Sequence, residues 1–469
     1  MSNGEVSLAR GLSAAEAFYN VLLSAIEAHP DVFQADLKLR SLAEFRKIYP
    51  SYLPRFELAR ALNGKRLEVA RTLVTASNEL LAFTSDSETL ALASVLEGSA
   101  TSLPLEQISY AGAPGWVPQV VYDGRRWQGS EIGDLATTLA DRDVMTQAAA
   151  RQLLSLCRDS LDNGQLDLSD RKIVMLGAGA EMAPTRLFLE AGAEVLWIDV
   201  VPPPESWTEL AGMSGRLWFS PEGADLLRQP DRILATIKAF SDGSSVDLGL
   251  YAYAPGQLRE IRLTQAMNAI VDALPRPLLR SVTTLISPTT PTLLSDEECE
   301  ARKVRLDKAP FWQRSLAALR FFGRAGLAVG SSPCDVTQTV VGIQGLSYQA
   351  AQYLGKTLVA EVWAADGLRV SANTAAITRT RSMDHPVFAA AFEGAQAFGV
   401  ETMTPRQSRA LNGMLAVSDW LQPTQPKPGE VRLHGAVQAL PYVLEEALRV
   451  AALIGFCRAP RLIGELLRR

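Results

Sequence analysis

Two patterns of apolar and polar residues divide the chain. Over residues 13–98, apolar residues recur at helical spacing, as in "SAAEAFYNVLLSAIEAH" and "RLEVARTLVTASNELLAF", and Pro50 and Pro54 separate such stretches. A spacing of three to four residues gives a helix one apolar face, and prolines commonly mark helix boundaries. We therefore predict a mostly helical N-terminal domain over residues 1–165, with a further helix at "DVMTQAAARQLLSLCRDSL".

After the polar turn "DNGQLDLSD", short apolar runs alternate with amphipathic segments. The runs are "KIVML", "EVLWIDV", "GRLWF", "VDLGLYAYA", "SVTTLIS" and "LRVSANTA". Such alternation is typical of a parallel sheet with helices on both faces. We predict an α/β fold with a doubly wound parallel sheet over residues 166–425, in which the runs at 173–176 and 195–199 are neighbouring parallel strands. An insertion at about 290–340 interrupts it, and a C-terminal helical extension covers residues 426–469.

Composition narrows the classes of function. Apolar residues make up 47% of the chain and the net charge is -5, so the sequence offers no basic surface for nucleic acid. Four scattered cysteines without a CxxC pair, together with three histidines, argue against a structural zinc site and a disulfide framework. We expect no metal centre.

The sequence also predicts where the protein acts. "MSNGEVSLARGLSAAEAFYN" lacks the continuous apolar core of a secretory signal, and no run of about twenty uncharged apolar residues predicts a transmembrane segment. We expect a cytoplasmic protein with a small-molecule substrate. Whether it forms a homo-oligomer stays open.

The stretch "KIVMLGAGAEMAPTRLFLEAGAEVLWIDV" has the order strand, glycine-rich turn, helix and strand. Gly177 and Gly179 permit close backbone approach to a phosphate, and the following helix offers unpaired N–H groups. Asp199 ends the second strand, where a carboxylate can bind ribose hydroxyls and repel a 2′-phosphate. This favours NAD over NADP. Glu181 would lie near a pyrophosphate, so a unit of this shape without a nucleotide remains the alternative.

Four stretches between about residues 170 and 421 resemble, in order, motifs of the short-chain dehydrogenase/reductase family. They are the turn at 177–183, similar to TGxxxGxG, "DLGLYAYAPG", "YQAAQYLGKTLVAEVWAADGLRVSANTAAITRT", similar to a YxxxK helix and the strand after it, and "TPRQSRALNGMLAVSDWL". The resemblance implies a Rossmann-like domain. Ala183, at a glycine position of the motif, and Thr378 would then join Gly177, Gly179 and Asp199 in contacting the cofactor.

The same resemblance implies catalytic roles. Tyr348 would be the acid/base, and Gln352 stands where the family has its lysine. Ser287 falls where the substrate-binding serine would follow the fifth strand, although the family places this serine about a dozen residues before the tyrosine. Ser331 or Ser332 could equally serve.

The missing lysine changes the expected chemistry. A cation about 4 Å from a tyrosine is worth roughly 4 kcal/mol at an effective dielectric of 20, or about three pKa units. Without it, we expect the pKa of Tyr348 to stay near about 10. Lys356 lies two helical turns further, roughly 12 Å along the axis, and could partly substitute. A protonated tyrosine donates a proton more readily than it abstracts one, which favours reduction. The pair Tyr353 and Lys356 has i,i+3 spacing and ranks lower.

Two other segments leave their roles open. The aromatic and apolar segment 308–330 could line a hydrophobic substrate site, form a lid or make a subunit contact. Arg379 and Arg381 could hold a phosphate or carboxylate, or belong to a solvated loop.

Three functions remain in view. The leading one is an NAD(H)-dependent reductase of a carbonyl or related group. The alternatives are a non-catalytic nucleotide-binding or scaffold protein of the same fold, and an S-adenosylmethionine-dependent methyltransferase. The stretch from 348 to 380 has no ready place in a methyltransferase.

Overall fold

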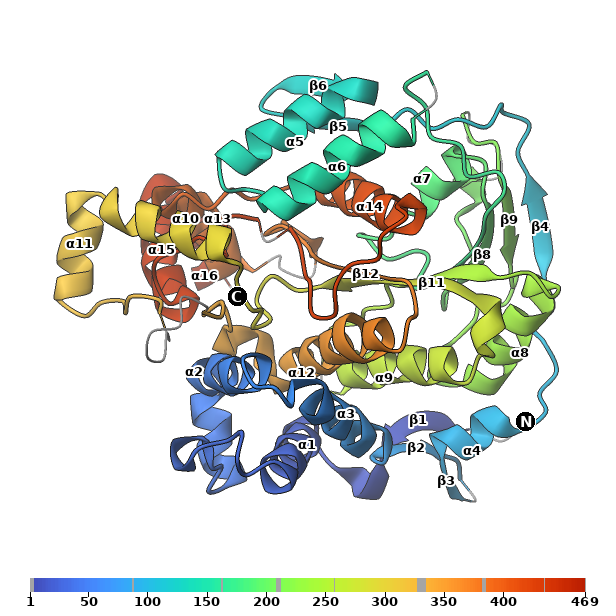
Figure 1. Cartoon of the computed structure of the whole chain (residues 1–469), viewed down its shortest axis with the longest axis horizontal. Coiled ribbons are helices and arrows are strands. Elements are labelled where there is room, and N and C mark those ends of the chain that lie inside the picture. Colours follow the sequence, from blue (N-terminus) through green and yellow to red (C-terminus); the bar gives the residue numbers. More distant parts are fainter. Residues whose placement is uncertain are drawn as a thin grey trace.

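The computed structural model describes residues 4–86, 88–161, 163–207, 212–256, 258–326, 335–381, 385–433 and 435–468. In this described part, the largest sheet has seven strands in the order β12-β11-β10-β7-β8-β9-β4 (Figure 1). Its parallel strands are β7 (Lys172–Leu176), β8 (Glu194–Ile198), β9 (Arg216–Phe219), β10 (Val246–Leu250), β11 (Leu279–Ile286) and β12 (Val370–Thr374). The edge strand β4 (Glu106–Ser109) pairs antiparallel with β9.

These strands form where the sequence predicts them because each is a short apolar run that is buried on both faces of the sheet. All five residues of β10 are buried, as are four of the five in β7. β7 and β8 pair in parallel, with Val174 opposite Leu196. The predicted mixed α/β fold with a mostly parallel sheet is therefore confirmed.

Strand order places a crevice in the middle of the sheet. The parallel strands start at β7, continue outward through β8 and β9, and then return to the other side of β7 with β10, β11 and β12. The connection after β7 leads to β8 on one side, and the connection after β10 leads to β11 on the other side, so a crevice opens between them. In open sheets of this kind, ligands bind between such connections at the carboxyl ends of the strands.

Helices cover both faces of the sheet (Figure 1). One face carries α8 (Pro230–Ser241), α9 (Arg259–Asp272), α12 (Gly345–Lys356) and its π-helical continuation η7 (Thr357–Trp363). The other carries α5 (Ile132–Asp141), α6 (Gln147–Asp159), α7 (Thr185–Glu190) and α14 (Pro405–Leu421). The two largest hydrophobic clusters lie on these opposite faces, so the sheet separates two cores.

The N-terminal residues form a further layer outside α9 and α12. It contains α1 (Ala14–Ala28), α2 (Leu42–Ala61), α3 (Arg66–Asn78), α4 (Leu92–Glu97) and a small antiparallel sheet of β1 (Glu5–Leu8), β2 (Leu81–Thr84) and β3 (Thr89–Ala91). Pro50 and Pro54 lie inside α2, so the prediction that they separate helices is wrong. Buried neighbours such as Leu53 and Phe56 hold the turns together despite the lost backbone hydrogen bonds.

Residues 1–165 also contribute to the central body, through β4, α5, α6 and the hairpin of β5 (Gln119–Tyr122) and β6 (Arg125–Gln128). The predicted domain boundaries stay a prediction. The described residues also form short helical turns: η1 (Ala9–Gly11), η2 (Ala35–Leu37), η3 (Gly129–Glu131), η4 (Glu205–Trp207), η5 (Arg276–Leu278), η6 (Gly342–Gln344) and η9 (Gln396–Phe398).

The helices of the insertion, α13 and the C-terminal helices gather at one end of the molecule (Figure 1). They are α10 (Asp296–Asp307), α11 (Phe311–Ala318), α13 (Pro386–Ala395), α15 (Leu444–Arg458) and α16 (Arg461–Leu467). α13 and α15 cross at Gly394, where an added Cβ would lie 1.9 Å from the Ala451 carbonyl oxygen. Only glycine permits this approach, which brings two alanine-rich helices together beside the site described below.

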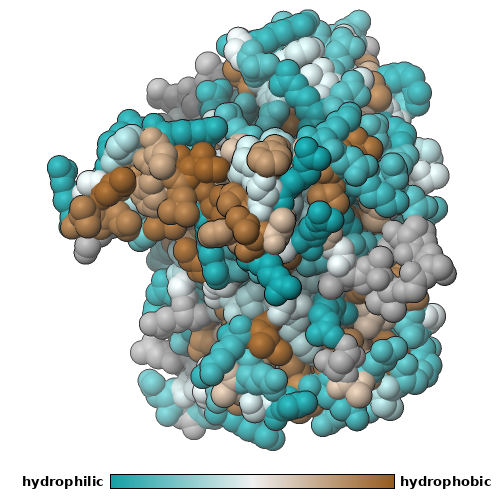
Figure 2. Space-filling view, turned by 90° about the vertical axis from the view of Figure 1, so that its left-hand side faces the viewer, coloured by the Kyte–Doolittle hydropathy of each residue, from teal (hydrophilic) through white to brown (hydrophobic). Residues whose placement is uncertain are grey.

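This end also exposes apolar side chains (Figure 2). Phe311 is 78% exposed and Leu319 is 69% exposed, on and just after the protruding α11. Among the described residues, no helix is both long and apolar enough to cross a membrane.

Candidate functional site

A cavity of about 1250 Å³ lies at the carboxyl ends of the parallel strands. Its walls include residues 179–182 after β7, 250–256 except position 254 after β10, 284–289 at the end of β11, and 375–378 after β12. The cavity therefore occupies the crevice that the strand order creates. It is larger than the roughly 300–1,000 Å³ of a typical small-molecule site, so it has room for a cofactor together with a substrate.

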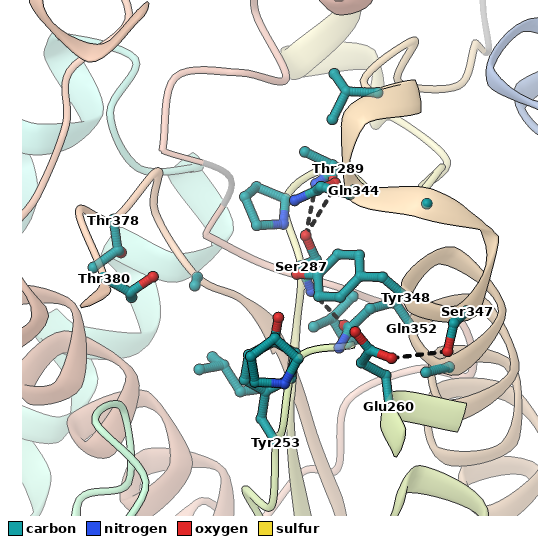
Figure 3. A pocket seen from close by; sticks show the side chains of 18 of the residues that line it. Tyr253, Glu260, Ser287, Thr289, Gln344, Ser347, Tyr348, Gln352, Thr378 and Thr380 are labelled. Atoms are coloured by element: carbon teal, nitrogen blue, oxygen red, sulfur yellow. Dashed lines mark hydrogen bonds between the residues drawn. The ribbon is translucent and has the colours of Figure 1, made fainter. Parts of the chain in front are cut away.

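Tyr348 projects into this cavity from the first turn of α12 (Figure 3). Its ring packs edge-to-face on Tyr253, with the ring centroids 6.0 Å apart. Burial raises the pKa of Tyr348, Tyr253 and Glu260 act in the same direction, and the Ser287 hydroxyl opposes them. The expected pKa near 10 is therefore too low, because the sequence does not show how deeply the hydroxyl is desolvated. Tyr348 is protonated at neutral pH.

Gln352 lines the same cavity one helical turn after Tyr348, as their spacing predicts. Its Oε1 atom accepts a hydrogen bond from the Ser287 backbone N–H at 2.7 Å. The uncharged side chain of Gln352 therefore joins α12 to the end of β11.

Ser287 is held in a chain of polar side chains (Figure 3). The Ser287 and Thr289 hydroxyl oxygens are 2.7 Å apart, and Thr289 donates to Gln344 Oε1 at 2.6 Å. Gln349 Nε2 donates to the same Gln344 oxygen at 3.1 Å. The network fixes the Ser287 hydroxyl beside Tyr348. The alternative serines, Ser331 and Ser332, lie outside the described residues.

Lys356 touches the cavity wall, but its ammonium group belongs to a buried ion cluster. Lys356 Nζ donates to Glu57 Oε1 at 2.7 Å and also to the Pro291 carbonyl. Tyr353, of the alternative pair, donates to Glu57 Oε2 at 2.7 Å. The prediction that Lys356 substitutes for the missing lysine is therefore wrong. A buried ammonium needs a buried anion, and the anion comes from a helix that the sequence does not place nearby.

The glycine-rich turn approaches β10 closely. Gly177 has φ +89°, and a Cβ there would lie 2.2 Å from the Ala252 amide nitrogen. Gly179 N–H donates to Asp199 Oδ2 at 2.9 Å, so the carboxylate sits against the turn. Of the predicted cofactor residues, Gly179 and Thr378 are among the described lining residues, whereas Gly177, Ala183 and Asp199 are not.

The turn does not lead directly into a helix. Ala183 is buried and donates its N–H to the Ala180 carbonyl at 2.9 Å, and α7 begins only at Thr185, after Pro184. With six residues, α7 is also short. The expected row of helix N–H groups at the glycines is therefore wrong, because residues 180–184 form irregular turns instead.

The segment after β12 contacts this turn. Glu181 Oε2 accepts the Arg381 backbone N–H at 3.1 Å, and the Arg381 guanidinium lies 3.9 Å from Oε1. Arg379 instead pairs with Glu393 at 2.9 Å. Thr378 lines the cavity, donates to the Ala376 carbonyl at 2.8 Å and lies 2.6 Å from the Ser408 hydroxyl. The positive charge of Arg381 offsets part of the negative charge of Glu181.

Sequence reasoning missed three parts of the wall. Residues 11–16, around the Ser13 cap of α1, line the cavity. Glu260 is buried there and accepts hydrogen bonds from Ser347 Oγ at 2.8 Å and Gly256 N–H at 2.9 Å. The third part is apolar and comes from α13, η9 and α15. One signal was available: "PVFAAAFEGA" has a single charged residue in ten, typical of a helix buried on most sides.

The aromatic and apolar segment at 308–330 is described as far as residue 326, and residues 308–326 do not line the cavity. Phe322 packs behind the wall, on Phe398 and Tyr442. Among the residues that the structure describes, no group of three or more His, Cys, Asp or Glu side chains could hold a metal ion.

Comparisons with protein-family models, curated proteins and solved structures find no match for this chain.

Proposed function

We propose that the protein is an NAD(H)-dependent reductase of the short-chain dehydrogenase/reductase type, acting on a carbonyl or related group. The observation that carries the proposal is that Tyr348, Ser287 and Gln352 line the same cavity as the glycine-rich turn at 179–182. Reduction of a carbonyl needs a hydride at its carbon and a proton at its oxygen. The turn at 179–182, where we propose that the cofactor binds, and the proton donor Tyr348 line the same cavity.

The strand order supports a Rossmann-like domain. Counted along the chain from β7, the described parallel strands have the order 6-5-4-1-2-3 across the sheet. This is the order 3-2-1-4-5-6 read from the other edge, which is the order of dinucleotide-binding sheets. The cavity lies at the point between β7 and β10 where such sheets bind their ligand.

The residues around the turn fit a nicotinamide dinucleotide. The Gly179–Asp199 contact leaves a second carboxylate oxygen for a ribose hydroxyl, and the charge of Asp199 disfavours a 2′-phosphate. NAD(H) is therefore the proposed cofactor over NADP(H). Bound there, the cofactor would supply a hydride.

The chain itself supplies the proton. Tyr348, kept protonated by burial, donates from its hydroxyl to the substrate oxygen, and Ser287 positions that oxygen beside it. The groups that act on Tyr348 in the described structure are Ser287, Tyr253 and Glu260, none of them cationic. Proton abstraction from an alcohol would need a tyrosinate, so reduction is the favoured direction.

A nucleotide titration tests the proposal. NADH should raise the melting temperature more than NADPH does, because ligands that bind only the native state stabilise it. Asp199→Ala should shrink the difference, whereas Asp170→Ala, at a 77% exposed side chain, should preserve it. Equal stabilisation by both nucleotides, or none by either, would contradict the cofactor assignment. Stabilisation by S-adenosylmethionine alone would favour the methyltransferase.

One observation favours a non-catalytic nucleotide-binding protein as the second candidate. Gln352 uses its carbonyl oxygen to hold Ser287 and brings no positive charge to Tyr348. Stabilisation by NADH without NADH oxidation across a panel of aldehydes and ketones would support this candidate over the reductase.

A further inference from the structure

One wall of the cavity is lined by apolar side chains. It is formed by α13, η9 and α15 and by the segment before α15, and the lining residues described between positions 388 and 451 all have apolar side chains. They include Phe392, Phe398, Leu440, Leu444, Ala447 and Ala451. We call these the apolar wall.

Charged groups lie elsewhere in the cavity. Among the described lining residues they are Glu16, Glu181, Glu260, Lys356 and Arg381. These belong to the α1 cap, the glycine-rich turn, the α9–α12 layer and the segment after β12. The cavity therefore has a polar part around Tyr348 and an apolar part toward the C-terminal helices.

This division restricts the substrate. A sugar or phosphate placed against the apolar wall would leave its polar groups without partners, which is unfavourable for each group. A hydrocarbon group would instead be removed from water there. Small side chains such as Ala447 and Ala451, which are 2% and 4% exposed, leave the space that such a group can fill.

We infer that the substrate is an aliphatic aldehyde or ketone whose hydrocarbon chain lies along the apolar wall while its carbonyl lies at Tyr348. This inference rests on the proposed reductase function for the carbonyl end. Binding of a hydrocarbon chain at the apolar wall can be tested separately from reduction, because the wall would also bind a chain that carries no reducible group.

The first experiment therefore uses primary alcohols of six to twelve carbons as probes, without cofactor. Calorimetry on the full chain should show affinity rising with chain length, by up to about fourfold for each buried methylene. Affinity that is independent of chain length would overturn the inference.

Variants locate the binding. Ala447→Phe, and the milder Leu448→Phe at a half-buried lining position, should weaken dodecanol binding at least tenfold. Leu453→Asn is the matched control, because Leu453 is on α15 but 65% exposed and outside the lining. It should bind like the unchanged protein. Equal losses in Leu453→Asn, or none in either narrowing variant, would show that the chain binds elsewhere.

Turnover separates this inference from the proposed function. Aldehydes of the same chain lengths should be reduced with NADH, with KM falling as the chain lengthens. If the alcohols bind through the apolar wall and no aldehyde is reduced, the wall assignment stands and the reductase proposal fails. If short aldehydes are reduced as well as long ones, with equal KM, the reductase stands and the chain inference fails.

Discussion

The behaviour of Tyr348 follows from the atoms around its hydroxyl. The helical spacing of Tyr348 and Gln352 is visible in the sequence, but the burial that raises the tyrosine pKa is not. The sequence also does not show that the Ser287 backbone N–H donates a hydrogen bond to the side-chain carbonyl oxygen of Gln352. Gln352 therefore has a structural role of its own, because it accepts the hydrogen bond of the Ser287 N–H.

Tyr348→Phe removes one hydroxyl and little else. For a general acid, turnover should fall by about 10²- to 10⁴-fold while NADH binding stays nearly unchanged. Tyr110→Phe is the control, because its hydroxyl bonds the Trp207 carbonyl away from the cavity. An equal loss of turnover in both variants would show that Tyr348 is not the general acid.

The pH dependence of reduction should follow the raised pKa of Tyr348. A proton donor is active below its pKa, and this pKa lies above the ordinary value of about 10. Turnover should therefore not decline through loss of the tyrosine proton between pH 7 and about 9. A pH–rate profile that falls through neutrality by a single deprotonation, and loses that step in Tyr348→Phe, would contradict this assignment.

Gln352→Lys places a cation one turn from Tyr348. It should lower the tyrosine pKa, shift the pH optimum toward neutrality and add alcohol oxidation. It should also lower stability by about 1–3 kcal/mol, since the Ser287 N–H loses its acceptor. Gln352→Met should lower stability in the same way, but it brings no cation and should not lower the tyrosine pKa. If both variants have the same pH–rate profile, charge at this position does not control the tyrosine.

At the scale of elements, α12 and its continuation η7 face two environments. Tyr348 and Gln352 face the cavity, whereas Tyr353, Lys356 and Glu361 extend into the N-terminal layer. There Arg60 of α2 bonds both Glu57 and Glu361 at 2.8 Å, and Arg66 of α3 pairs with Glu361 at 2.7 Å. The ion cluster fixes α12 and η7 against α2 and α3.

Glu57→Gln should destabilise the protein strongly, by about 3–5 kcal/mol, because it leaves Arg60 and Lys356 short of one buried negative charge. Glu300→Gln, in an ion pair whose Glu300 side chain is 65% exposed, should cost at most about 1 kcal/mol. Denaturant unfolding measures both. Similar small losses would show that the cluster contributes little.

The same variant has a pH signature. Burial alone would raise the pKa of Glu57, but Arg60 and Lys356 outweigh it and hold the pKa below its ordinary value. A lowered carboxylate pKa stabilises the fold above the unfolded-state pKa and stops doing so as pH falls through the folded value. The stability gap between the unchanged protein and Glu57→Gln should therefore narrow as the pH drops below about 4.5.

At the scale of the whole molecule, three distant parts of the chain meet at one cavity. The α1 cap at residues 11–16, the loops of the sheet and the apolar wall of α13 and α15 all line it. The segments at 11–16 and 437–451 thus help to enclose the crevice. The apolar wall supplies the specificity that we infer for a hydrocarbon chain.

The parallel strands could be predicted from the sequence alone, because a run such as 172–176 must be buried on both faces wherever it lies. The turn at Gly177 and Gly179 and the common face of Tyr348 and Gln352 could be predicted too, since they are local properties of a few adjacent residues. Strand β4 escaped prediction because its residues "EQIS" are mostly exposed at the sheet edge and lack such a run.

The partners of several charges depend on the tertiary structure. Lys356 pairs with Glu57, 299 residues earlier, and Glu181 meets Arg381, 200 residues later. The apolar wall likewise depends on the close crossing of α13 and α15 at Gly394. Periodicity reports which side of an element is buried, because that depends on neighbours three or four positions away. It does not report which element covers that side, and here that choice sets the partners of Lys356 and Glu361.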